Sequence, residues 1–178
     1  MTEKVRMYSG RVWKYGDGVN TDVIFPGKYT YTLREPAEIA AHALEDLDPT
    51  FAIQAGQGDI VVAGRNWGNG SSREQAVTCL KYKGIAAIVA RSFARIYYRN
   101  GINQGLLLIT CPEVVDAAEA GDILEIDLSH SLIRLRDRNY PFPPFSSTAL
   151  NIITIGGLVP YVRQKLGIIR SDTVSLSD

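Results

Sequence analysis

The chain has 178 residues, of which 46% are hydrophobic and 21% charged, and its 19 Lys+Arg balance its 19 Asp+Glu. This length and composition indicate one globular domain rather than a disordered chain. A net charge of zero exerts no long-range attraction, so we expect neither nucleic acid nor a membrane as partner. No stretch approaches the ~18 apolar residues of a membrane span. Without an apolar signal segment at residues 1–10, a cytoplasmic location is expected.

Cysteine and histidine are scarce. The chain contains Cys79 and Cys111, neither in a CxxC pair, and the histidines His42 and His130. Two thiols are too few for a disulfide framework or for the ligands of an iron–sulfur cluster. We therefore expect no metal site built from this chain alone.

The N-terminal part begins with a strand and continues irregularly. Residues 5–13 alternate with a period of two, which predicts a strand. Residues 19–26 carry an apolar patch without a regular period, and residues 27–35 are polar and aromatic, so both are expected as loops. Pro36 stands where a helix favours proline, and the apolar residues after it have helical spacing.

The middle of the chain alternates short apolar segments with amphipathic ones. Strands are predicted at residues 59–64, 85–90 and 106–110. Helices are predicted from Ser71 to about Lys83, from Ser92 or Phe93 toward Ile102, and from Pro112. Strands joined through helices by short connections are typical of parallel βαβ units.

The C-terminal part adds β structure of another kind. Residues 123–128 and 132–135 predict a hairpin, residues 140–145 a rigid coil, and residues 149–164 a helix broken at Gly156. We expect a mixed α/β domain with a second β layer, formed by residues 1–168, and a flexible tail at residues 169–178.

Residues 64–74 form the best candidate for a functional site. They place a glycine-rich turn before Ser71, where a helix is expected to start and to offer free N–H groups to an anion. Arg73 adds a planar fork that matches a carboxylate. The alternative is structural, because Ser71 and Glu74 also fit a capping box. The pattern is neither a P-loop nor a dinucleotide fingerprint.

Three further charged residues have two interpretations each. Arg95 and Arg99 lie four apart on an expected helix, where like charges repel, so an anion should compensate them. A structural ion pair is the favoured explanation and a ligand the alternative. Asp22 lies among apolar residues. It is interpreted either as an ionised group that orients its neighbours or as part of an Asx turn.

Four sequence blocks together resemble a known family. Residues 20–26, 64–75, 92–100 and 156–158 match, in order and spacing, the small subunit of 3-isopropylmalate dehydratase, in the aconitase superfamily. The resemblance implies a swivelling three-layer β/β/α domain with a mixed sheet, like the C-terminal domain of aconitase. This agrees with the mixed α/β pattern of the segments.

The resemblance also implies an activity, a cofactor and a partner. The family dehydrates and rehydrates a hydroxy-dicarboxylic or tricarboxylic acid, and 2-isopropylmalate in leucine biosynthesis is the leading substrate. A [4Fe-4S] cluster is held by a separate large subunit, so this chain would act only in a hetero-oligomer. Homoaconitate and dimethylmalate remain alternative substrates. A non-catalytic carboxylate-binding module and a purely structural subunit are the alternatives of another class.

The matched positions imply roles for individual residues. Ser71 would be the general base and Asp22 an active-site aspartate, while Ser72 and Arg73 would hold a substrate carboxylate. Supporting roles for the loops fall to Asn66, Gly70, Arg95 and Arg99.

The chain departs from the family pattern at a few positions. Asn69 and Gln75 stand where many members have cysteine and histidine. The larger departure lies at residues 28–34, where the family's Tyr-Leu-Arg-Thr stretch is absent. Arg34 is a candidate to replace the arginine of that stretch as a substrate-binding residue. The side group of the substrate is therefore left open.

Overall fold

The computed structural model describes residues 7–168, and within them the strands form one mixed sheet. The strand order is β4-β3-β2-β1-β5-β6-β7. The strands are β1 (Met7–Lys14), β2 (Ile60–Ala63), β3 (Ala87–Ala90), β4 (Leu107–Thr110), β5 (Ile123–Asp127), β6 (Leu132–Leu135) and β7 (Arg138–Pro141). Strand β1 pairs in parallel with β2 and antiparallel with β5, so it joins a parallel half to an antiparallel half.

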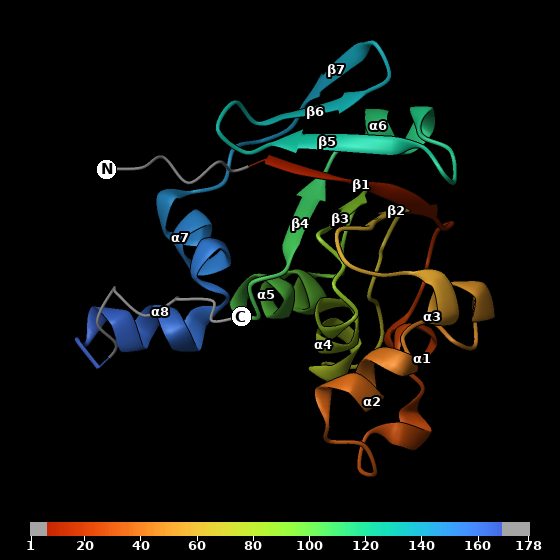
Figure 1. Cartoon of the computed structure of the whole chain (residues 1–178), viewed down its shortest axis with the longest axis vertical. Coiled ribbons are helices and arrows are strands. Elements are labelled where there is room, and N and C mark those ends of the chain that lie inside the picture. The colour runs from red at the N-terminus through yellow and green to blue at the C-terminus, as the bar shows by residue number, and fades with distance from the viewer. Residues whose placement is uncertain (1–6, 169–178) are drawn as a thin grey trace, which may run out of the picture.

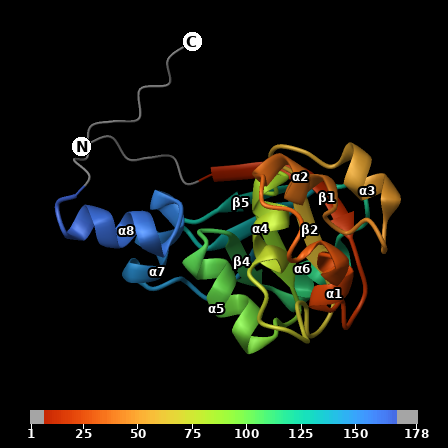
Figure 2. The same cartoon turned by 90° about the horizontal axis from the view of Figure 1, so that it is seen from below.

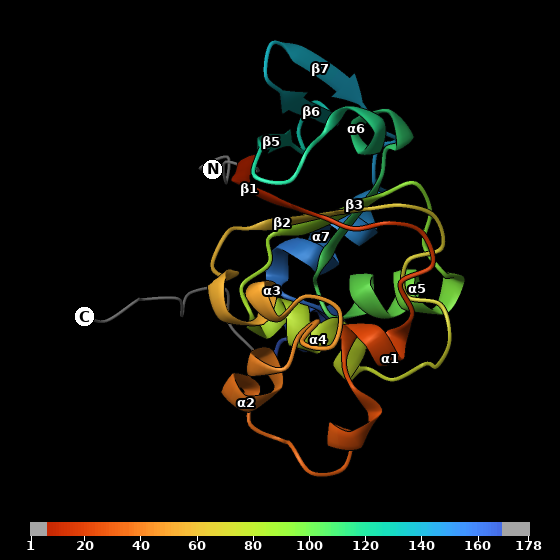
Figure 3. The same cartoon turned by 90° about the vertical axis from the view of Figure 1, so that its right-hand side faces the viewer.

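The helices lie mainly below the parallel half of the sheet in Figure 1, with β5, β6 and β7 above it. Figure 3 shows the same order of layers from the side. The helices are α1 (Thr21–Ile24), η1 (Gly27–Tyr29, a 3-10 turn), α2 (Pro36–Ala41), α3 (Pro49–Gln54), α4 (Gln75–Tyr82), α5 (Arg95–Asn103), α6 (Pro112–Ala117), α7 (Ser147–Ile155) and α8 (Leu158–Lys165). Helices α8 and α1 lie at opposite ends of the molecule (Figure 2).

Alternation along the parallel strands builds two apolar cores. Val61, Ile88 and their neighbours face one core, which the side chains of α2, α4 and α5 complete. Ile60 and Val62 face the other core, together with residues of β5, β6 and α6. The antiparallel half therefore covers one face of the parallel half and helices cover the other. This β/β/α arrangement confirms the expected fold class.

Most predicted elements are present, including the βαβ units, the hairpin and the helix break at Gly156. Three expectations are wrong. Residues 19–26 contain α1, which the side chain of Asn20 caps. Residues 140–145 are not all coil, because β7 pairs with β6 as an edge strand, where Pro141 is tolerated. Helix α4 begins at Gln75 rather than at Ser71. The expected tail at residues 169–178 lies outside the described residues.

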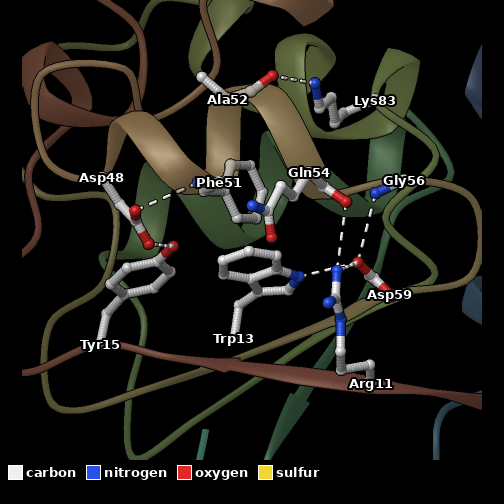
Figure 4. A network of polar contacts seen from close by, with 10 residues as sticks. All are labelled: Arg11, Trp13, Tyr15, Asp48, Phe51, Ala52, Gln54, Gly56, Asp59 and Lys83. Atoms are coloured by element: carbon white, nitrogen blue, oxygen red, sulfur yellow. Dashed lines mark hydrogen bonds and ion pairs between the residues drawn. The ribbon is translucent and has the colours of Figure 1, made fainter. Parts of the chain in front are cut away.

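A polar network fixes the segment around α3 on β1 (Figure 4). The Asp59 carboxylate accepts hydrogen bonds from Trp13 Nε1 at 2.8 Å and from Arg11 Nη2 at 3.1 Å. Asp48 caps α3 and accepts the Tyr15 hydroxyl at 2.9 Å. Burial, and next the bond to Asp48, raise the pKa of Tyr15, so this phenol stays protonated. The network holds in place the chain that leads from α2 into the sheet.

Candidate active site

Three segments meet beyond the carboxyl ends of β1, β2 and β3. An isolated parallel bridge joins Asn20 to Asn69, and another joins Trp67 to Phe93. The Gly68 N–H donates to the Val19 carbonyl at 2.8 Å. The elbow after β2, residues 64–72, thus lies between the segment that follows β1 and the one that follows β3. Ligands of parallel sheets bind at this edge.

Glycine is required where the elbow turns. Gly68 has φ +77°, and a Cβ there would lie 2.1 Å from the ring of the buried Tyr97. Gly70 has φ +105°, a region that favours glycine. Asn66 also has a positive φ of 56°, and its backbone N–H donates to Ser92 Oγ at 2.9 Å. Asn66 and Gly70 therefore shape the loop that presents Ser71.

Ser71 is exposed, but its hydroxyl oxygen has two polar neighbours. Arg73 Nε donates to Ser71 Oγ at 2.9 Å. Thr21 Oγ1 lies 3.0 Å from the same oxygen and also accepts the Ser71 backbone N–H at 2.9 Å. Because the Thr21 oxygen accepts that N–H, its own hydrogen is free to point at Ser71 Oγ. The Ser71 oxygen can thus receive two hydrogen bonds while its own proton faces outward.

Arg73 is held from three sides and is only 19% exposed. Besides Ser71, it donates through Nη1 to Thr30 Oγ1 at 2.9 Å and through Nη2 to the Asp22 carboxylate. Three of its five N–H donors are used in this way, and two remain for a ligand. Gly27 lies close beside it, since a Cβ at Gly27 would be 3.1 Å from Arg73 Nη1. Asp22, whose side chain is 74% exposed, forms an ion pair with Arg73.

The other predicted site residues lie around this centre. Ser72 is exposed; its carbonyl accepts Asn100 Nδ2 at 3.2 Å, and its hydroxyl has no hydrogen-bond partner within residues 7–168. Arg34 is exposed, without an ion pair in the described part of the chain, and borders an open depression of about 350 Å³ beside Thr30. Gln75, at a position where the family pattern varies, donates to the Thr30 carbonyl at 3.3 Å.

Two sequence interpretations are corrected here. Ser71 and Glu74 form no capping box: α4 starts at Gln75 without a side-chain cap, and the Glu74 carboxylate accepts Gln104 Nε2 instead. The free N–H groups at the start of α4 therefore do not lie at Ser71. The Ser71 backbone N–H itself donates to Thr21 Oγ1. The favoured ion pair of Arg95 and Arg99 is absent as well, since both are exposed and have no acidic partner among residues 7–168.

Thr21 and Thr30 are the site residues that the sequence analysis missed. Thr21 is 1% exposed and lies directly before Asp22, so its position in the matched block was the available signal. Thr30 had no such signal, because it lies in the loop where the family pattern is lost.

The thiols are poorly placed for metal binding. Cys79 and Cys111 are both buried, and they belong to different cores on opposite faces of the sheet. Burial raises the pKa of each thiol and disfavours the thiolate that a cluster needs. The described residues contain no group of three or more His, Cys, Asp or Glu side chains suited to a metal ion.

None of the described helices is both long and apolar enough to cross a bilayer.

The fold and the site define a domain of the aconitase C-terminal class. The family described as "Aconitase C-terminal domain" matches residues 21–114, which contain Asp22, Ser71 and Arg73. An aconitase X from Thermococcus kodakaraensis shares the fold, with a TM-score of 0.51 at 16% identity over 74% of this chain and 91% of that one.

More similar relatives narrow the class to one family. The 3-isopropylmalate dehydratase small subunit of Halothermothrix orenii is 47% identical over 86% of this chain and 94% of its own length. The one from Aquifex aeolicus is 46% identical over 89% and 96%. A solved 3-isopropylmalate dehydratase structure from Methanocaldococcus jannaschii has a TM-score of 0.85 at 42% identity, covering 91% of this chain and 96% of that one. The chain belongs to the 3-isopropylmalate dehydratase small-subunit family, which makes it a hydro-lyase subunit rather than a non-catalytic module.

Proposed function

We propose that this chain, with a large subunit that carries a [4Fe-4S] cluster, interconverts 2-isopropylmalate and 3-isopropylmalate by dehydration and rehydration. The observation that carries the proposal is the Ser71 hydroxyl, exposed at the elbow and hydrogen-bonded by Arg73 at 2.9 Å. The names of the relatives support the substrate, and "small subunit" in those names supports the partner.

Ser71 is the general base of the proposal. An unassisted serine is a poor base, because its alkoxide is unstable at neutral pH. Arg73 Nε donates to Ser71 Oγ, and the Thr21 hydroxyl at 3.0 Å can donate to the same oxygen, so both can stabilise negative charge on it. The alkoxide takes the proton from the carbon next to a substrate carboxylate, and the electrons of that C–H bond form the double bond as the C–O bond on the adjacent carbon breaks. The cluster of the large subunit would supply the Lewis acid that accepts the departing hydroxyl group. In rehydration Ser71 returns the proton.

Arg73 and Ser72 bind the substrate carboxylate in the proposal. The free hydroxyl of Ser72 and the two free N–H donors of Arg73 belong to the two residues that directly follow Ser71. Asp22 and Thr30 hold the guanidinium of Arg73 in place. A guanidinium whose orientation is already fixed loses little entropy when it binds a carboxylate. Asn66 and Gly70 support the loop. Arg95 and Arg99 are exposed and unpaired within residues 7–168, so any support they give comes without an ion pair of their own.

The cluster is assigned to the large subunit because the donors of this chain do not fit it. Two buried thiols on opposite faces of a sheet cannot bind one cluster. The residues described here therefore account for proton transfer and carboxylate binding only. A reducing cytoplasm, which preserves free thiols, is the compartment that we propose.

The loop at residues 28–34 is proposed to read the side group of the substrate. Arg34, beside the depression near Thr30, is the candidate contact. Since the loop departs from the family pattern, homoaconitate and dimethylmalate are the competing substrates. A panel of these acids, assayed on the reconstituted enzyme, decides between them.

The test of the base is reconstitution with the cognate large subunit under anaerobic conditions. Wild type should interconvert the isopropylmalates, and Ser71→Ala should lose ~10²–10⁴-fold in kcat. Ser129→Ala, in the exposed turn after β5, is the matched control and should keep full activity. Turnover by Ser71→Ala within a few-fold of the control would remove Ser71 as the base.

A further inference from the structure

A cluster of four side chains outside the catalytic centre ties η1 to the segment that directly follows α2. The Tyr29 ring stacks on the His42 ring with centroids 4.0 Å apart. His42 Nδ1 lies 2.5 Å from Glu45 Oε2, and Lys28 Nζ lies 3.4 Å from Glu45 Oε1. Lys28 also sits 4.8 Å above the Tyr29 ring. We call these four residues the His42 clamp.

The Glu45 carboxylate is the polar centre of the clamp. Burial works to raise its pKa, but the bonds to His42, Tyr29 and Lys28 outweigh burial and leave the pKa below its ordinary value. Glu45 is therefore ionised at neutral pH and attracts both the imidazole and the ammonium group. The clamp thus joins two segments through stacking and charge together.

The clamp lies one residue away from a contact of Arg73. Tyr29 is followed by Thr30, whose N–H donates to the Gly27 carbonyl at 3.1 Å and closes the turn. The Thr30 side chain accepts Arg73 Nη1, and its carbonyl accepts Gln75 Nε2. The position of η1 therefore sets the position of the Thr30 hydroxyl against Arg73.

The loop has little else to hold it beyond Thr30. Tyr31 is 91% exposed, and Arg34 is exposed with no ion pair in the described residues. Leu33 packs partly against the core, and its N–H donates to the Tyr29 carbonyl at 3.1 Å. Tyr29, seated on His42, is therefore the common anchor of both the turn and the loop.

We propose that His42 is a positioning residue: by stacking on Tyr29 and bonding Glu45, it holds the 27–30 turn so that Thr30 keeps Arg73 in its binding orientation. Arg73 is the carboxylate-binding residue of the proposed function, so the catalytic part of this inference rests on that function. The structural part does not, because it concerns the turn itself.

The first experiment uses the whole chain without its partner. Hydrogen exchange of the backbone amides in residues 27–34 is compared between wild type, His42→Ala and His130→Ala. His130 is the matched control, since its Nδ1 also bonds a carboxylate three residues away, Asp127 at 2.7 Å, on the remote hairpin. His42→Ala should speed exchange in this segment at least about tenfold, because local opening becomes easier. Equal exchange in the two variants overturns the clamp, whatever the enzyme assays show.

The second experiment tests the route through Thr30 on the reconstituted enzyme. His42→Ala and Thr30→Val should each lower kcat/KM by about tenfold, through a higher KM and a lower kcat, because Arg73 both binds the carboxylate and donates to Ser71 Oγ. If His42 acts through Thr30, the double variant should lose little more than either single one. His42→Phe, which keeps a ring over Tyr29, should recover part of the loss.

The other possible results of these experiments also count for or against the role of His42. Multiplied losses in the His42→Ala/Thr30→Val enzyme overturn the route through Thr30, and so does a loss of kcat alone. Should His42→Ala fold poorly, Glu45→Gln replaces it in the same double variant, because it keeps the size of the side chain and removes the charge. A wild-type enzyme without isopropylmalate turnover would count against the proposed function, while the exchange result would still decide the clamp.

Discussion

The buried hydroxyl of Thr21 lies 3.0 Å from the Ser71 hydroxyl and accepts the Ser71 backbone N–H at 2.9 Å. One side chain thus fixes the backbone of the proposed base and faces its reactive oxygen. Thr21 comes from α1 and Ser71 from the elbow after β2, so the pair also joins two of the segments that build the site.

The Thr21→Val variant should separate the hydrogen bonds of the Thr21 hydroxyl from its packing, because valine keeps the shape of the threonine side chain and lacks the hydroxyl. We expect kcat to fall about 10–100-fold, since the alkoxide loses one of two donors. The Ser71 N–H would lose its partner as well, which should lower the free energy of unfolding by about 1–2 kcal/mol. Kinetics of the reconstituted enzyme measure the change in kcat, and urea unfolding of the isolated chain measures the change in the free energy of unfolding. Unchanged kcat would assign Thr21 a structural role only.

Arg73→Lys should be severe although it keeps the charge. The guanidinium donates hydrogen bonds to Ser71, Thr30 and Asp22 through three different nitrogens. The single nitrogen of an ammonium group cannot reach all three acceptors with this geometry. A fall in kcat/KM of about 10²–10³-fold is expected. Arg163→Lys, at an exposed position on α8, is the control and should be neutral. An active Arg73→Lys enzyme would show that charge alone suffices at this position.

Gly68→Ala should destabilise the chain strongly. The new Cβ would lie 2.1 Å from the Tyr97 ring, at a backbone φ of +77°. Overpacking and strain together should lower the free energy of unfolding by about 3 kcal/mol or more. Gly16→Ala is the matched control, because a Cβ at Gly16 meets nothing within 4 Å. Comparable denaturation midpoints for the two variants would contradict the tight turn.

Glu45 should give the stability of the chain a dependence on acidic pH. Its folded pKa is lower than the ordinary value of 4.5, so its contribution is present above that pH and is lost as pH falls through the folded pKa. Wild type should therefore have a higher Tm than Glu45→Gln at pH 6, and the difference should shrink toward pH 3. Thermal unfolding of the isolated chain across this range provides the measurement. A constant difference would mean that the charge of Glu45 contributes nothing.

Much of the fold is predictable because it follows from local repetition. The period-two alternation and short apolar segments gave the parallel strands, and Gly156 marked the end of α7. The elements that the sequence analysis missed, which include α1, η1, α3 and β7, are short. Helix α1 has 4 residues and β7 has 4, so their own pattern is too brief to identify them. Contacts made elsewhere stabilise them: α1 by the elbow and β7 by its pairing with β6.

The sequence by itself determined which residues we propose to carry the chemistry: the order Gly70, Ser71, Ser72, Arg73, and Asp22 in an earlier block. Only the tertiary structure decided which groups lie against the Ser71 hydroxyl. From the local sequence alone, Ser71 and Glu74 fit the capping box of a helix start as well as they fit a functional site. Contacts from residues 43 to 51 positions away take the Ser71 N–H and the Arg73 guanidinium, and α4 starts at Gln75. A window of local sequence holds no information on partners so distant, because only folding brings them within hydrogen-bonding distance.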